Sequence, residues 1–144
     1  MEKFFIDQWD SNKTVLQKEL QNINIDNLNY IDIVKLVFKY VVIKADEHSS
    51  LDEENITEID NGDYQGMLLY LIPYHRYQPS YDEYLVTLEY YGSCSGCDTL
   101  QHIQYSLQTK EEQINDILSL ALNIVQNTRY LKNLYSGDNG VYYG

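Results

Sequence analysis

The sequence predicts an α+β fold in which a small antiparallel sheet of about three strands packs with N-terminal and C-terminal helices. Apolar residues recur every three or four positions near both ends of the chain, which is typical of amphipathic helices. Between these ends, short apolar or alternating runs are separated by turn residues, which is typical of strands. The 144 residues, of which 44% are hydrophobic, suit a single domain over residues 1–144.

The N-terminal third is predicted to be helical. Residues 3–22 are expected to form two pieces, because Asp10 or Ser11 can act as an N-cap within them. A stronger helix, with apolar residues at three- and four-residue spacing, is predicted from residue 26 or 27 to about residue 45. The acidic residues 46–55 show no periodicity, so they are expected to form an exposed loop or a frayed turn.

The middle of the chain is predicted to form the sheet. Residues 56–60 and 66–74 flank the dipeptide Asn61-Gly62, which accepts the positive φ of tight turns, so the two runs are expected to pair as a hairpin. The second run is apolar on both faces, which indicates an inner strand. Apolar and polar side chains alternate over residues 83–91, which predicts a third strand.

Two helices are predicted after the sheet. Asp98 can cap a short helix that contains Leu100 and Ile103. Thr109, followed three residues later by Glu112, forms a capping-box pattern at the start of a long helix. Apolar residues three and four positions apart then give this last helix a buried stripe.

The negative charge of the chain is concentrated in its centre. The net charge is −12 at pH 7, and residues 45–109 contain twelve acids against one base, Arg76. A phosphate backbone selects for Lys and Arg, so direct binding to nucleic acid is not expected. The segment would suit a basic groove on a protein, although an acidic surface that only keeps the protein soluble is the simpler alternative.

Tyrosine is the second unusual feature, with 15 in the chain against three Phe and one Trp. Tyrosine anchors protein interfaces and its ring attracts Arg and Lys, but high β-propensity would explain the same residues without an interface. Six acids and four tyrosines are the candidate partner-binding residues: Asp52, Glu53, Glu54, Glu58, Asp60, Asp63, Tyr64, Tyr77, Tyr81 and Tyr84.

Cys94 and Cys97 form a C-x-x-C pair between a predicted strand and a predicted helix. A helix N-terminus lowers the pKa of a thiol, which would suit a redox-active pair, and two such cysteines supply half of a structural zinc site. No histidine belongs to a second paired motif, although His102 could add a third ligand, or two chains could share a site. Two small thiols packed in a tight turn explain the pair without zinc or redox chemistry.

Other chemistry has less support. The glycine-rich loop at residues 92–97 could present backbone N–H groups to an anion, so a protein that binds a small nucleotide ligand is an alternative, but the P-loop pattern is absent. No nucleophile elbow, metalloprotease motif or triad spacing is present, so no enzymatic activity and no cofactor other than zinc is predicted. No apolar run suits a membrane span or a signal peptide, so a cytoplasmic protein is expected.

The stretch from Asn61 to Gln101 resembles a group of small uncharacterised proteins encoded by bacteriophages of low-GC Gram-positive hosts. The most specific parts are Gly62–Gly66, GDYQG, and Gly92–Gln101, GSCSGCDTLQ. The resemblance covers about a third of the chain and implies a phage origin, with the cytoplasm of the infected host as the location.

The phage context suggests a class of function by analogy. Small acidic phage proteins are often inhibitors of host nucleic-acid machinery, including anti-CRISPR proteins and DNA mimics. The expected function is therefore an interaction protein that occupies a basic groove of a host defence or nucleic-acid-processing protein. Whether the chain forms a homodimer stays open.

Overall fold

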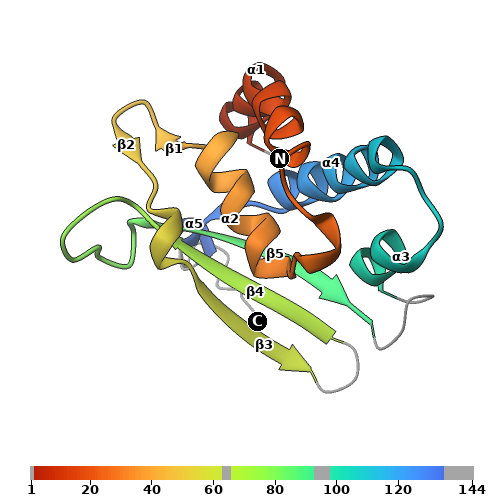
Figure 1. Ribbon diagram of the computed structural model, residues 1–144. Helices are drawn as coiled ribbons and strands as arrows, with labels where there is room; N and C mark the ends of the chain where they lie inside the picture. Colours follow the sequence, from red (N-terminus) through yellow and green to blue (C-terminus); the bar gives the residue numbers. More distant parts are fainter. Residues whose placement is uncertain (1, 63–65, 93–97, 135–144) are drawn as a thin grey trace.

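A computed structural model describes residues 2–62, 66–92 and 98–134, and over these ranges the chain has an α+β fold with helices toward both ends (Figure 1). The helices are α1 (Lys3–Leu20), α2 (Tyr30–Tyr40), α3 (Thr99–Tyr105), α4 (Lys110–Gln126) and α5 (Leu131–Leu134). Two short 3₁₀ turns are η1 (Ile25–Asn27) and η2 (Glu53–Asn55). The strands are β1 (Lys44–Asp46), β2 (Ser49–Ser50), β3 (Thr57–Gly62), β4 (Gly66–Pro73), β5 (Tyr84–Tyr91) and β6 (Arg129–Tyr130).

The larger sheet is antiparallel throughout, with the strand order β3-β4-β5-β6. Side chains alternate between its two faces, and the inner face packs against the helices drawn in front of and above it in Figure 1. The buried side chains of β4 and β5 on this face are Leu68, Tyr70, Ile72, Leu85, Thr87 and Glu89. Thr87 Oγ1 donates to the carbonyl oxygen of Ile124 at 2.8 Å, which joins β5 to α4.

The first helix is continuous, so the predicted break near residue 10 is wrong. Asp10 and Ser11 are exposed positions inside α1, where they cap nothing. Phe5, Leu16 and Leu20 are almost fully buried in the core, and α1 packs against α2 and α4. Tertiary packing of one long apolar face therefore outweighs a local capping signal.

The second helix is shorter than predicted at both ends. It begins at Tyr30, after a separate 3₁₀ turn, and ends at Tyr40 because the chain turns into the β1–β2 hairpin. Gln8 of α1 binds the segment that follows α2, since its Oε1 accepts from the backbone nitrogens of Ile43 and Lys44, each at 3.1 Å. This contact joins residues about 35 positions apart, so no local sequence pattern predicts it.

The sheet region has more strands than the three expected. The predicted loop at residues 46–55 contains parts of the β1–β2 hairpin and η2, and β6 adds a short fourth strand to the larger sheet. Asn61 and Gly62 lie within β3, with Gly62 opposite Gly66, so the predicted turn at these two residues is wrong. Residues 63–65 lie outside the described ranges. β1, β2 and β6 are two or three residues long, too short to give a periodic signal.

The helices after the sheet begin where the sequence predicts. Asp98 caps α3, because its side chain accepts from the backbone nitrogen of Gln101 at 3.0 Å. At the start of α4, Thr109 accepts from the nitrogen of Glu112 at 3.1 Å, and Glu112 accepts from the nitrogen of Thr109 at 2.8 Å. None of the helices within the described ranges is long and apolar enough to cross a membrane.

Two isoleucines with different burial test the packing of the core. Ile117 of α4 is fully buried, so Ile117→Ala should lower the free energy of unfolding by about 2–5 kcal/mol through lost contacts and a residual cavity. Ile59 of β3 is 43% exposed, and Ile59→Ala should cost less than about 1 kcal/mol. Equal losses in urea unfolding would show that α4 does not form the core described.

Candidate functional site

An acidic cleft of about 520 Å³ opens between β3, α3 and the segment that enters α2. Its walls include three carboxylates, those of Glu58, Asp60 and Asp98, together with Tyr30 and Tyr91. Among the lining residues that the structure describes there is no Lys, Arg or His. The cleft therefore concentrates negative charge that no neighbouring cation in its described walls compensates.

Tyrosine hydroxyls organise each carboxylate of the cleft. The pairs are Tyr70 with Glu58 Oε2 at 2.8 Å, Tyr91 with Asp60 Oδ1 at 2.6 Å and Tyr30 with Asp98 Oδ1 at 3.0 Å. Burial, reinforced by the nearby carboxylates, raises the pKa of Tyr30 and of Tyr70 above the ordinary value of 10.0. These hydroxyls therefore stay protonated at neutral pH and act as donors to the acids.

Asp98 is a structural member of the cleft, because its carboxylate is only 4% exposed and has several donors. Oδ1 accepts from the Tyr30 hydroxyl and from the nitrogen of Gln101, and Oδ2 accepts from the nitrogen of Gly92 at 2.8 Å. The Tyr30 hydroxyl in turn accepts from the nitrogen of Leu100 at 3.1 Å. These bonds fix the start of α3 against α2 and against the end of β5.

Glu58 and Asp60 are the acids that a partner can reach. Both are exposed on β3, and each accepts from a single tyrosine hydroxyl. In the described part of the chain no donor reaches the second oxygen of either carboxylate. Tyr105, which is 73% exposed, also lines the cleft and offers a ring face to a cation. The arrangement suits a guanidinium or ammonium group of a binding partner.

Three other predicted acids do not line the cleft. Asp52 is the N-cap of η2, and Glu53 and Glu54 lie in η2, just before β3 begins. Asp52 is partly engaged, since its carboxylate accepts from the nitrogen of Glu54 at 3.3 Å and from Asn55 Nδ2 at 2.6 Å. Asp63 lies outside the described residues, as does Tyr64.

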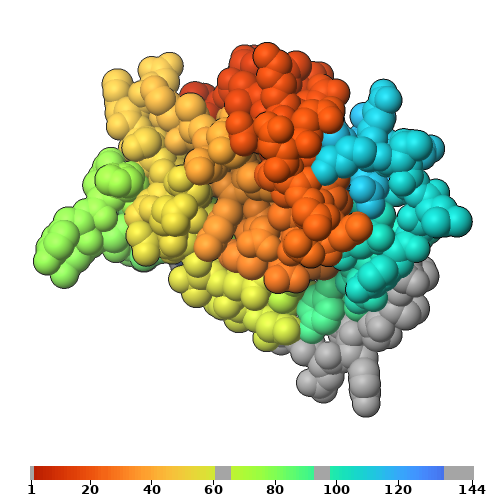
Figure 2. Space-filling view, in the orientation of Figure 1, coloured from red at the N-terminus to blue at the C-terminus, as the bar shows by residue number. Residues whose placement is uncertain are grey.

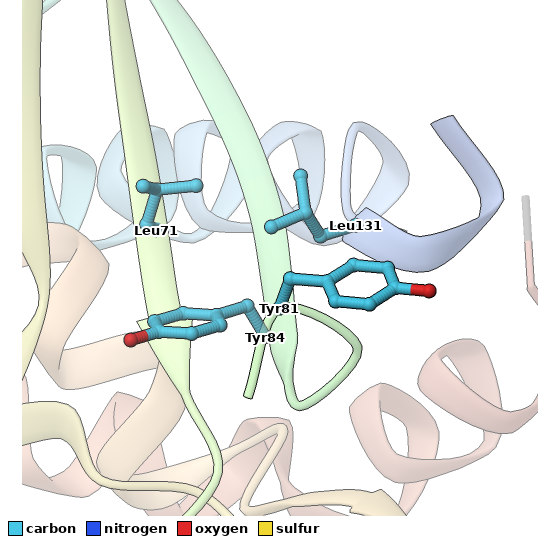
Figure 3. Close-up of a pocket in the computed structure, with 4 residues that line it drawn as sticks. All are labelled: Leu71, Tyr81, Tyr84 and Leu131. Atoms are coloured by element: carbon cyan, nitrogen blue, oxygen red, sulfur yellow. The ribbon is translucent and has the colours of Figure 1, made fainter. Parts of the chain in front are cut away.

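The predicted tyrosine anchors that the structure describes, Tyr77, Tyr81 and Tyr84, do not line the acidic cleft. Tyr77 is 96% exposed in the segment between β4 and β5, which projects from the body in Figure 2. Tyr81 and Tyr84 line a shallow apolar pocket of about 380 Å³ together with Leu71 and Leu131, and their rings extend in opposite directions (Figure 3). Leu71 alternates with the buried Tyr70, so this pocket lies on the sheet face away from the cleft.

Several residues of the cleft were not foreseen in the sequence. Asp98 was expected only as a helix cap, and Tyr30, Tyr91 and Tyr105 were not among the candidates. Asp60 and Tyr91 are 31 residues apart, and only the register of three paired strands brings them within 2.6 Å. The one available signal was the alternation of β5, which puts Tyr91 on the same face as Glu89.

The cysteine pair cannot be placed, because Cys94 and Cys97 lie outside the described residues. Within the described ranges, no group of three or more His, Cys, Asp or Glu side chains is arranged to hold a metal ion. The thiol and zinc hypotheses therefore stay predictions from the sequence.

No protein-family model, curated protein or solved structure matches the chain. The function therefore has to be argued from the chemistry of the cleft and of the charged segment around it.

The contribution of Asp98 to stability can be compared with that of Asp52, a more exposed helix cap. Asp98→Ala leaves the buried donors of Tyr30, Gly92 and Gln101 without their acceptor, so the free energy of unfolding should fall by about 2 kcal/mol or more. Asp52→Ala removes an N-cap from η2 and should cost about 1 kcal/mol. Chemical denaturation of both variants gives the comparison, and a loss at Asp98 no larger than at Asp52 would contradict this role.

Proposed function

We propose that the protein is a non-enzymatic interaction protein whose acidic cleft receives a basic side chain from the groove of a host nucleic-acid-processing or defence protein. By occupying that groove, the chain would exclude the nucleic acid that normally binds there, as a phage-encoded inhibitor. The two proteins would meet in the cytoplasm of the infected cell. The observation that carries the proposal is the pair of exposed carboxylates, Glu58 and Asp60, in a cleft whose described walls contain no cation.

The chemistry of the cleft favours an Arg or Lys side chain. Charge-assisted hydrogen bonds between a guanidinium or ammonium group and a carboxylate are among the stronger polar contacts in proteins. The tyrosine hydroxyls already orient one oxygen of Glu58 and of Asp60, so a partner meets preorganised acceptors. A cation that enters would also pass the exposed ring of Tyr105.

The charge around the cleft would act at longer range. Residues 45–109 carry twelve acids against one base, and Glu53 and Glu54 of η2 lie close to the start of β3 in the sequence. A field of one sign speeds encounter with a basic surface and weakens as salt screens it. Charge pairing in the cleft would determine which partner binds, and the wider field would raise the rate of association.

The cleft does not favour the nucleotide-binding alternative. Glu58 and Asp60 would repel the phosphate groups of a nucleotide, and no described residue of the cleft wall is a cation that could offset them. A protein that binds the basic groove of a partner through its acidic residues fits the same cleft without this electrostatic repulsion.

The first experiment is an affinity pull-down of the tagged chain from a bacterial lysate, with bound proteins identified by mass spectrometry. Nucleic-acid-binding proteins should be retained at about 0.05 M salt and released at about 0.5 M, where the Debye length falls to a few ångströms. Retention of nothing but general chaperones, or retention that salt does not change, would contradict the proposal.

Matched variants then separate the cleft from general acidity. Glu58→Gln with Asp60→Asn removes two charges and keeps the acceptor oxygens for Tyr70 and Tyr91, so the fold should persist. Binding of the captured protein should fall about tenfold or more. Glu53→Gln with Glu54→Gln removes the same charge outside the cleft and should have a smaller effect. Equal losses would show that the cleft has no special part in binding.

A further inference from the structure

A second cavity, of about 540 Å³, lies on the other side of α3, between α3, α4 and β5. Leu100, Gln101 and Gln104 of α3 face the acidic cleft, whereas Thr99, His102 and Ile103 face this second cavity. The two sets occupy different sides of one helix, so the cavities are separate. The volume lies in the range of small-molecule sites.

Most of the described residues that line this cavity have polar side chains. Thr99 and His102 come from α3, and α4 contributes Asp116, Ser119, Asn123 and Gln126. The α4 residues are three or four positions apart, so they form one polar stripe along the helix. Asp116 accepts from Gln108 Nε2 at 2.8 Å, which holds its carboxylate in place.

Glu89 of β5 closes the inner end of the cavity and is only 4% exposed. Its Oε1 accepts from the nitrogen of Tyr90 at 3.1 Å, but among the described residues its Oε2 is buried without a hydrogen-bond partner. Buried polar atoms in folded proteins almost always have a partner, and a buried carboxylate is costly without a cation. The described lining contains no Lys or Arg, and its one histidine, His102, is exposed.

We propose that this cavity is a binding site for a small organic cation with a primary amine or guanidinium group, for which Glu89 is the counter-ion. The positive charge of such a cation would pair with the carboxylate of Glu89, whose Oε2 has no hydrogen-bond partner among the described residues. Ser119, Asn123 and Gln126 supply neutral oxygens for the remaining N–H groups. Asp116 adds a second carboxylate, which suits a ligand with a charge at each end.

Binding of a cation at Glu89 should depend on pH. Burial, with a smaller contribution from the charge of Asp98, raises the pKa of Glu89 from 4.5 to about 7. The cation binds the ionised carboxylate, so affinity should fall about tenfold from about pH 8 to about pH 6, where the carboxyl is mostly protonated. Asp116 and His102 are the other titratable groups among the described residues that line the cavity.

The test is an NMR titration of the full chain with putrescine, with butanediol as the uncharged ligand of equal chain length. At about pH 8, putrescine should shift the amide signals of Thr99, His102 and Asn123 saturably, and butanediol should not. Glu89→Gln keeps the shape of the side chain and removes the charge, so it should weaken binding about tenfold or more and abolish most of the pH dependence. Any pH dependence of binding that persists in this variant does not come from Glu89.

Two further variants keep the test decisive. Ser119→Leu should block the cavity from an exposed position on α4 and also abolish binding, without altering Glu89. Glu111→Gln removes the same charge from an exposed position of α4 that lines neither the cavity nor the acidic cleft, and should bind putrescine as the wild type does. No saturable shift at about pH 8, equal shifts with butanediol, or unchanged binding by Glu89→Gln or Ser119→Leu would overturn the proposal. Equal loss of binding in Glu111→Gln would show that the overall charge of the chain holds the cation, and would also overturn the proposal.

The melting temperature reports the ionisation of Glu89 without any added ligand. The pKa of Glu89 is higher in the folded chain than its ordinary value of 4.5, so its ionisation opposes folding and stability should fall as pH rises from 4.5 toward 7. Glu89→Gln should therefore melt at a higher temperature than the wild type at about pH 8 and at a similar temperature at about pH 4. Glu111→Gln, an exposed change on α4, should show no such difference between the two pH values.

Discussion

The arrangement of helices and sheet depends on the buried carboxylate of Asp98. It caps α3, accepts from the backbone at the end of β5 through Gly92, and accepts from the hydroxyl of Tyr30 in α2. A carboxylate that is 4% exposed is tolerated only because donors surround it, so the three elements must keep their relative positions. The place of α3 follows from this contact, and α3 is the wall that the acidic cleft and the second cavity share.

Acidic residues in this protein differ by environment more than by residue type. Asp98 is buried and fully paired, whereas Glu58 and Asp60 are exposed and each has a single tyrosine donor. Glu89 is buried, and one of its oxygens has no hydrogen-bond partner in the part of the chain that the structure describes. The first kind of acid stabilises the fold, the second is accessible to the basic side chain of a protein, and the third can be neutralised by a proton or by a small cation.

Local signals in the sequence predicted the elements whose contacts are also local. The caps at Asp98 and Thr109 involve partners only three residues away, so a short pattern carries the whole interaction. The ends of α2 and the continuity of α1 were predicted wrongly, because they depend on contacts such as that of Gln8 with Ile43. For the site, Glu58 and Asp60 were candidates from charge alone, but the tyrosines that orient them were not.

The sequence by itself determined the α+β class, the sheet in the middle of the chain and the concentration of negative charge there, because composition and short-range periodicity carry these properties. Only the tertiary structure decided which acids share a cleft and which one is buried. Tyr30 and Asp98 are 68 residues apart, and Tyr91 and Asp60 are 31 apart, so strand register and helix packing bring them together. Tyr84 lies on the other face of the sheet, since side chains of a strand alternate between two faces, and Tyr81, which precedes the strand, lines the same pocket.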